Sequence, residues 1–152
     1  MCFPLEIKPG AGLSPLLFGA TMNDAEKFFG KTQEAQLIDD IEEFPTTVWH
    51  YWTMGFTLFF DEQNSRLFYS VEIDNFDTVL WNQKIFDFKE KQIIELFKSK
   101  GITLYETERQ DWGENRLSFD QANIDFYFEK NKLISINYGR LTNNSPILIL
   151  PN

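Results

Sequence analysis

Cysteine and histidine are nearly missing from this 152-residue sequence, which contains one of each, Cys2 and His50. A single cysteine allows no intrachain disulfide, so a reducing compartment is the default expectation. A zinc site of histidines and cysteines is excluded, and a Ser-His-Asp triad would depend on His50 alone. The common phosphate-binding, dinucleotide-binding and nucleophile-elbow motifs do not occur. We therefore expect no catalytic residue, no metal and no cofactor.

Long apolar runs and basic residues are scarce as well. No stretch approaches the roughly 18 apolar residues of a membrane span, and residues 1–6 lack the basic and apolar regions of a signal peptide. Lys and Arg number 14 against 23 Asp and Glu, for a formal charge of −9. Because nucleic acids and anionic membranes attract basic patches, we expect neither as a partner. The charge is compatible with a basic protein partner, and we expect a cytoplasmic protein.

Aromatic residues are plentiful, with 16 Phe, 5 Tyr and 4 Trp. They fall in an alternating pattern in residues 55–61, and the pattern returns 68 positions later in residues 123–129. A period of two indicates a strand with one face in a core. The apolar positions of the two segments are Phe56, Leu58 and Phe60, then Ile124, Phe126 and Phe128.

The same offset aligns Phe18 with Phe86 and Phe29 with Phe97. Each half reads as a helix (22–29; about 88–100, the second capped by Asp87 and Glu90), then a strand (34–38, weak; 102–106, stronger), then three further strands. These strands are 47–53, 55–61 and 66–73 in the first half and 115–120, 123–129 and 132–138 in the second. We predict an α+β fold of two tandem helix-plus-antiparallel-sheet repeats, about 13–75 and 79–140, in one domain with a C-terminal tail, 141–152. Both helices would pack on one face of the sheet. The alternative is two unrelated segments that share generic patterning.

Residues 18–30 read FGATMNDAEKFFG, a phenylalanine-glycine pair, a threonine cap, a short helix and a closing glycine. This stretch resembles the opening of the β-lactamase-inhibitor-protein-like and SmpA/OmlA-like units. In those families a helical element precedes a small antiparallel sheet, and the inhibitor proteins carry the unit twice. The resemblance implies a binding module and assigns no functional residue. Ala20 stands where the lipoprotein members tend to have methionine.

The strand pattern also predicts which side chains point away from the helices. We expect an uncovered aromatic patch with carboxylates around it, a combination typical of protein-binding surfaces. The candidate partner-binding residues are His50, Trp52, Phe59, Asp120, Asp125 and Tyr127. An acidic rim before the strands would steer a basic partner, and it consists of Asp39, Asp40, Glu42 and Glu43.

The leading functional hypothesis is a non-enzymatic protein-binding module, inhibitor-like or immunity-like, that caps a basic protein. One alternative is a self-associating structural protein that buries its sheet face in a homodimer. The other is a small-ligand binder or enzyme that uses His50 with an outward acid, Asp120 or Asp125.

Overall fold

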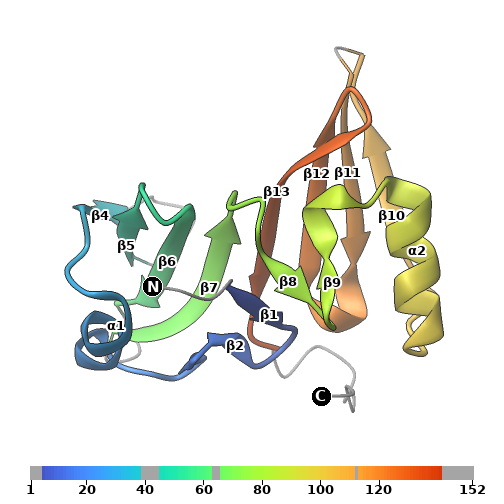
Figure 1. Cartoon of the computed structure of the whole chain (residues 1–152). Coiled ribbons are helices and arrows are strands. Elements are labelled where there is room, and N and C mark those ends of the chain that lie inside the picture. The colour runs from blue at the N-terminus through green and yellow to red at the C-terminus, as the bar shows by residue number, and fades with distance from the viewer. Residues whose placement is uncertain (1–4, 39–44, 63–65, 112, 142–152) are drawn as a thin grey trace.

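The computed structural model describes residues 5–38, 45–62, 66–111 and 113–141 (Figure 1). Within these residues the protein is mostly β, since 49% lie in strands and 19% in helices. The strands form one sheet of eight and a second sheet of five. The predicted α+β class with two tandem helix-plus-sheet repeats was therefore wrong. The five-stranded sheet combines short strands from both halves of the chain, so the architecture is a sheet packed on a sheet and not two separate repeats.

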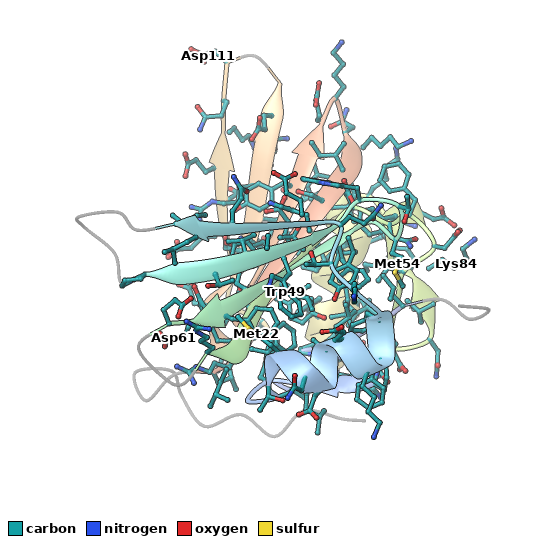
Figure 2. The ribbon with its side chains drawn as sticks, turned by 90° about the vertical axis from the view of Figure 1, so that its left-hand side faces the viewer. Met22, Trp49, Met54, Asp61, Lys84 and Asp111 are labelled. Atoms are coloured by element: carbon teal, nitrogen blue, oxygen red, sulfur yellow. The ribbon has the colours of Figure 1, made fainter. Side chains whose placement is uncertain are left out.

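The eight-stranded sheet is antiparallel throughout, in the order β10-β11-β12-β13-β7-β6-β5-β4. Two runs of four strands meet at its centre, where β7 pairs with β13. Figure 2 shows the β4–β6 strands crossing the view while β10–β12 run up it, so the sheet twists strongly. Its strands are β4 (Glu34–Ile38), β5 (Thr46–Tyr51), β6 (Phe56–Asp61), β7 (Leu67–Ile73), β10 (Glu106–Arg109), β11 (Glu114–Phe119), β12 (Ile124–Glu129) and β13 (Lys132–Gly139).

The second sheet is built from very short strands of two chain segments. Its strands are β1 (Glu6–Lys8), β2 (Gly12–Ser14), β3 (Leu16–Leu17), β8 (Val79–Leu80) and β9 (Gln83–Lys84). The pair β1–β8 is parallel and places Ile7 opposite Leu80. Strands of two or three residues have no period that a sequence could reveal. For that reason the sequence did not predict a second sheet.

Two α-helices lie on the same side of the large sheet as the small one, toward the viewer in Figure 1. Helix α1 (Met22–Phe29) begins with a capping box, in which the Thr21 hydroxyl accepts from the Asp24 N–H and the Asp24 carboxylate accepts from the Thr21 N–H. Helix α2 (Glu90–Ser99) follows the 3₁₀ turn η1 (Ile85–Asp87). Asp87, the expected cap of the second helix, lies inside that turn, so the expectation was wrong.

The core fills the space between the large sheet and the elements that cover it. From α1, Phe29 packs against Phe56 with a ring-centroid distance of 4.8 Å. From α2, Phe97 stacks on Phe119 at 4.0 Å and meets Phe126 edge-on at 5.6 Å. These aromatic contacts stabilise the fold by burying large apolar areas. Figure 2 shows Met22 and Trp49 between α1 and the strands, at the border of the same core.

Most of the individual long elements lie where the sequence placed them. The helix over 22–29 and the strand over 34–38 are confirmed, and the three strands of each half agree to within two residues at each end. The strand expected over 102–106 was wrong, because β10 starts only at Glu106. The domain boundaries stay a prediction, and the tail 142–152 lies outside the described residues. Among the described residues, no helix combines the length and apolarity needed to cross a bilayer.

Candidate functional site

The face of the large sheet that points away from both helices and the small sheet is here called the open face. Strand register brings one side chain from every strand into a single row across this face, here called the transverse row. In order across the sheet it contains Glu34, His50, Thr57, Glu72, Asn137, Asp125, Ser118 and Glu106. Four of the eight side chains are carboxylates, and none is lysine or arginine.

His50 and Trp52 form a fixed aromatic pair at the β5 end of the transverse row. Their rings stack at 4.1 Å with an interplanar angle of 9°. His50 Nε2 lies 2.8 Å from Gln36 Oε1, and because an amide oxygen only accepts, this nitrogen carries the hydrogen. The other ring nitrogen, Nδ1, lies 3.0 Å from the Thr57 hydroxyl oxygen, within hydrogen-bond distance. The indole N–H of Trp52 donates to Glu34 at 3.2 Å, so the ring is oriented although 59% of the residue is exposed.

A small hollow of about 40 Å³ opens next to Trp52, and we call it the indole hollow. It is lined by Trp52, Gly55, Phe56, Thr57, Glu72 and Asp74. The turn between β5 and β6 is fastened to the end of β7, because the Asp74 N–H donates to Gly55 O at 3.0 Å and Asn75 Nδ2 donates to Met54 O at 2.8 Å. These hydrogen bonds hold the backbone walls of the indole hollow in place before any ligand arrives.

The two carboxylates of the indole hollow lie close to one another at the end of β7. Loss of solvent raises the pKa of Glu72, and the nearby Asp74 charge raises it further, while His50 acts in the opposite direction. Among the described residues, neither Glu72 nor Asp74 forms an ion pair with a lysine or arginine. The hollow thus concentrates negative charge beside an exposed indole.

A second region of the open face surrounds Tyr127 on β12. Arg116 lies opposite Tyr127 and forms an ion pair with Glu108 at 3.0 Å. Burial raises the pKa of the Tyr127 hydroxyl, with a further increase from the Asp125 charge, and the Arg116 guanidinium opposes the increase. Tyr127 also borders a hollow of about 260 Å³ near the β10–β11 hairpin. Here the Arg116 guanidinium neutralises the Glu108 carboxylate, so this region attracts a cation less strongly than the indole hollow.

The predicted site residues are only partly brought together. His50, Asp125 and Tyr127 all lie on the open face, but His50 and Asp125 are four strands apart. That separation is roughly 19 Å at about 4.8 Å per strand, too far for a shared proton. Asp120 leaves the sheet and begins the 3₁₀ turn η2 (Asp120–Ala122). Neither acid can form the catalytic pair with His50 that the sequence allowed.

Phe59 is less available than the sequence suggested. It faces Val48 across the β5–β6 pair, and Val48 is buried on this face. Phe59 itself is half-buried, as is Tyr127. Of the three aromatics expected to be uncovered, only Trp52 is strongly exposed.

The predicted site residues omit several carboxylates of the open face, among them Glu34, Glu72, Asp74 and Glu106. Along β7 the side chains alternate between the two faces, so Glu72 lies on the face opposite to that of the buried Val71 and Ile73. This signal was present in the sequence. The approach of Glu72 to Trp52 depends on pairing between β6 and β7, which the alternation cannot show. The expected acidic rim, Asp39, Asp40, Glu42 and Glu43, lies outside the described residues.

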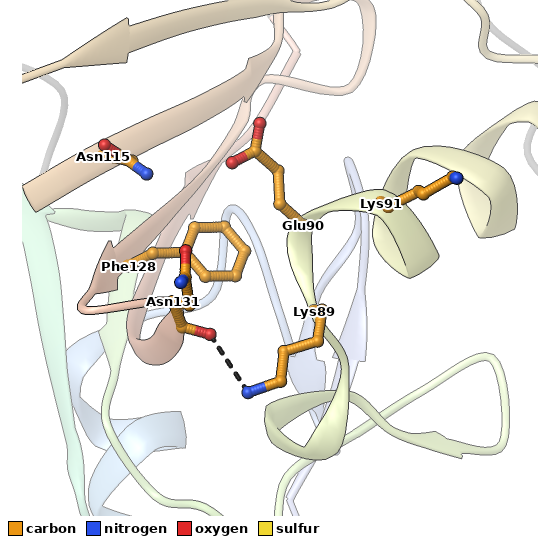
Figure 3. A pocket seen from close by; sticks show the side chains of 6 residues that line it. All are labelled: Lys89, Glu90, Lys91, Asn115, Phe128 and Asn131. Carbon is orange, nitrogen blue, oxygen red and sulfur yellow. Dashed lines mark hydrogen bonds between the residues drawn. The ribbon is translucent and has the colours of Figure 1, made fainter.

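A further hollow of about 430 Å³ lies on the other side of the sheet at the start of α2. Figure 3 shows Lys89 directed at Asn131, whose carbonyl accepts from its ammonium group at 3.3 Å, and Lys91 turned away from Phe128. Glu90 is paired with Arg109 at 2.9 Å. Lys89 and Lys91 form no ion pair among the described residues, so this hollow presents positive charge and does not suit a basic partner.

In the part of the chain that the structure describes, no three histidine, cysteine, aspartate or glutamate side chains are arranged to hold a metal ion. No protein-family model, curated protein or solved structure matches the chain. The resemblance to the inhibitor-protein-like and SmpA/OmlA-like units therefore stays a prediction.

Proposed function

We propose that this protein is a non-enzymatic binding module, inhibitor-like or immunity-like, that caps a basic protein with its open face. The observation that carries the proposal is the transverse row, where four carboxylates cross the sheet without a lysine or arginine. A partner with a basic surface would neutralise these charges and would be steered toward them by the net charge of −9.

Trp52 supplies the apolar anchor of the proposed interface. Tryptophan and arginine are over-represented among residues that dominate binding energy, and an ordered ring loses little conformational freedom on binding. The stack with His50 and the hydrogen bond to Glu34 hold the Trp52 ring in one orientation. Binding therefore requires little further ordering at this position.

The experiment compares wild-type protein with Trp52→Ser and Phe28→Ser variants as affinity baits at low and moderate salt. Phe28 is the matched control, because it is an exposed phenylalanine on α1 at 45% exposure, away from the open face. We expect wild type and Phe28→Ser to retain the same basic protein and Trp52→Ser to lose it. A hot-spot loss of about 2 kcal/mol or more corresponds to a decrease in affinity of roughly 30-fold.

The captured protein is then purified and cross-linked to the wild type. Cross-links to Glu72 or Asp125, and weaker binding at higher salt, would support the proposal. Equal capture by all three baits, or cross-links confined to the helices, would contradict it. Circular dichroism of each variant verifies that the fold is retained.

A further inference from the structure

The indole hollow combines three features that suit one kind of ligand group. It has an exposed indole wall, two neighbouring carboxylates, and room for a single small head group. Its volume of about 40 Å³ is far below the roughly 300–1,000 Å³ of typical small-molecule pockets. A whole metabolite would not fit, whereas the end of a protein side chain would.

The charges of the indole hollow select a cation. Neither Glu72 nor Asp74 forms an ion pair with a lysine or arginine among the described residues, and the repulsion from Asp74 is one reason why the pKa of Glu72 is raised. A cation placed between them would relieve that repulsion. Cations also bind favourably over an indole face, with tryptophan the best of the aromatic residues.

We propose that the indole hollow binds the guanidinium group of an arginine side chain on the basic partner. A guanidinium is planar, so it can lie flat on Trp52 while its N–H groups point in its own plane toward Glu72 and Asp74. An ammonium group is a compact, strongly hydrated point charge and does not stack in this way. This inference rests on the proposed function, since it names the group that the partner presents.

The backbone around the indole hollow is built to keep it open. Gly55 has φ of 76°, and a Cβ at this position would lie 2.8 Å from Asn75 Cβ. The glycine thus allows the turn to approach the end of β7 closely, which brings Trp52 and Asp74 to the same small space. The backbone of the indole hollow therefore needs little further ordering when a side chain binds.

The test uses capped tripeptides, acetyl-Gly-Arg-Gly-amide and its citrulline and lysine counterparts, with NMR detection of the tryptophan indole N–H groups. The chain has four tryptophans, and a Trp52→Phe variant identifies the signal of Trp52. We expect a saturable shift of that signal at millimolar arginine peptide. Citrulline has nearly the same shape without the charge and should cause no saturable shift, and lysine should bind at least fivefold more weakly.

Glu72→Gln and Asp74→Asn should each weaken arginine-peptide binding by about tenfold, which is 1.4 kcal/mol. The matched control is Glu129→Gln, which removes another exposed carboxylate on β12 and should leave binding unchanged. Equal shifts with citrulline, equal affinity for lysine, or an equal loss in Glu129→Gln would overturn the inference. If the peptide fails to bind while the basic protein is still captured in a Trp52-dependent way, only the arginine assignment fails. If both fail, the proposed function fails with it.

Discussion

Gly55 shows at the scale of one residue how local backbone geometry prepares the candidate site. Its φ of 76° lies in the region that favours glycine, and Asn75 leaves no room for a Cβ. Gly101 has a similar φ of 86°, but no atom lies within 4 Å of the position where a Cβ would be. An alanine at Gly101 would therefore meet backbone strain alone, whereas an alanine at Gly55 would meet both backbone strain and steric overlap.

We predict that Gly101→Ala lowers the free energy of unfolding by about 1–2 kcal/mol, the cost of a left-handed alanine. Gly55→Ala should lower it by about 1–3 kcal/mol more, because the clash with Asn75 is added. Chemical denaturation of both variants measures the difference. Equal losses would show that the contact between Gly55 and Asn75 is not tight in solution.

Removal of two buried hydroxyl groups, one unpaired and one hydrogen-bonded, is expected to change the free energy of unfolding in opposite directions. The Ser118 side chain is buried at 2% exposure, and its Oγ has no hydrogen-bond partner among the described residues. The Thr78 hydroxyl is also buried but donates to Asn75 O at 2.6 Å. An unpaired buried hydroxyl costs about 1–3 kcal/mol, whereas a paired one is stabilising.

We therefore expect Ser118→Ala to raise the free energy of unfolding by up to about 1 kcal/mol, and Thr78→Val to lower it by about 1–2 kcal/mol. Denaturant unfolding at neutral pH tests both. A clear destabilisation by Ser118→Ala would indicate that its hydroxyl has a hydrogen-bond partner after all.

At the scale of elements, the two edges of the large sheet differ in how they are protected. The edge strand β10 carries the charged residues Glu106, Glu108 and Arg109. The other edge, β4, presents Leu37 at 62% and Ile38 at 43% exposure. Charged residues block edge-to-edge pairing, and exposed apolar residues favour it.

We predict that any weak self-association at high concentration occurs through β4. Leu37→Lys should shift the sedimentation behaviour toward the monomer, because it places a charge on that edge. Thr107→Lys on β10 is the matched control and should have little effect. If neither change reduces association, the contact lies elsewhere, for example on the open face as in the homodimer alternative.

Elements also show where sequence reasoning succeeds. The helix α1 was predictable because Thr21 and Asp24 cap it and Gly30 follows it. The long strands β6 and β12 were predictable because six alternating residues are enough to show a period. The strands β8 and β9 have two residues each, too few to show any period.

At the scale of the whole molecule, two buried tyrosines tie distant parts of the chain together. The Tyr51 hydroxyl donates to Gly30 O at 2.9 Å, and the Tyr138 hydroxyl donates to Gly12 O at 2.9 Å. Burial raises the pKa of Tyr51 from 10 to about 12, with a smaller contribution from the Glu26 charge. Burial also raises the pKa of Tyr138 well above 10.

This shift predicts a loss of stability in alkaline solution. Above pH 10 the unfolded chain releases the Tyr51 proton, while the folded protein keeps it up to about pH 12. The unfolded state then binds fewer protons, so the free energy of unfolding falls as pH rises from 10 through 12. For Tyr51 the loss is about 2–3 kcal/mol, from two pKa units at 1.36 kcal/mol each.

Urea unfolding at pH 9, 10 and 11 measures the alkaline loss. Tyr51→Phe should be less stable than wild type at pH 9, because Gly30 O loses its donor, but its stability should fall less between pH 9 and 11. Parallel curves for wild type and Tyr51→Phe would contradict this assignment.

The sequence by itself determined α1, the long strands and the face on which His50, Asp125 and Tyr127 lie, because capping and alternation act over a few neighbouring residues. Only the tertiary structure decided that residues 6–17 and 79–84 form a second sheet, and that β7 pairs with β13. It also decided that Glu72 and Asp74 meet Trp52 in one hollow. These contacts join residues about 20 to 70 positions apart, and their register depends on how strands pair across the sheet, which no local pattern records.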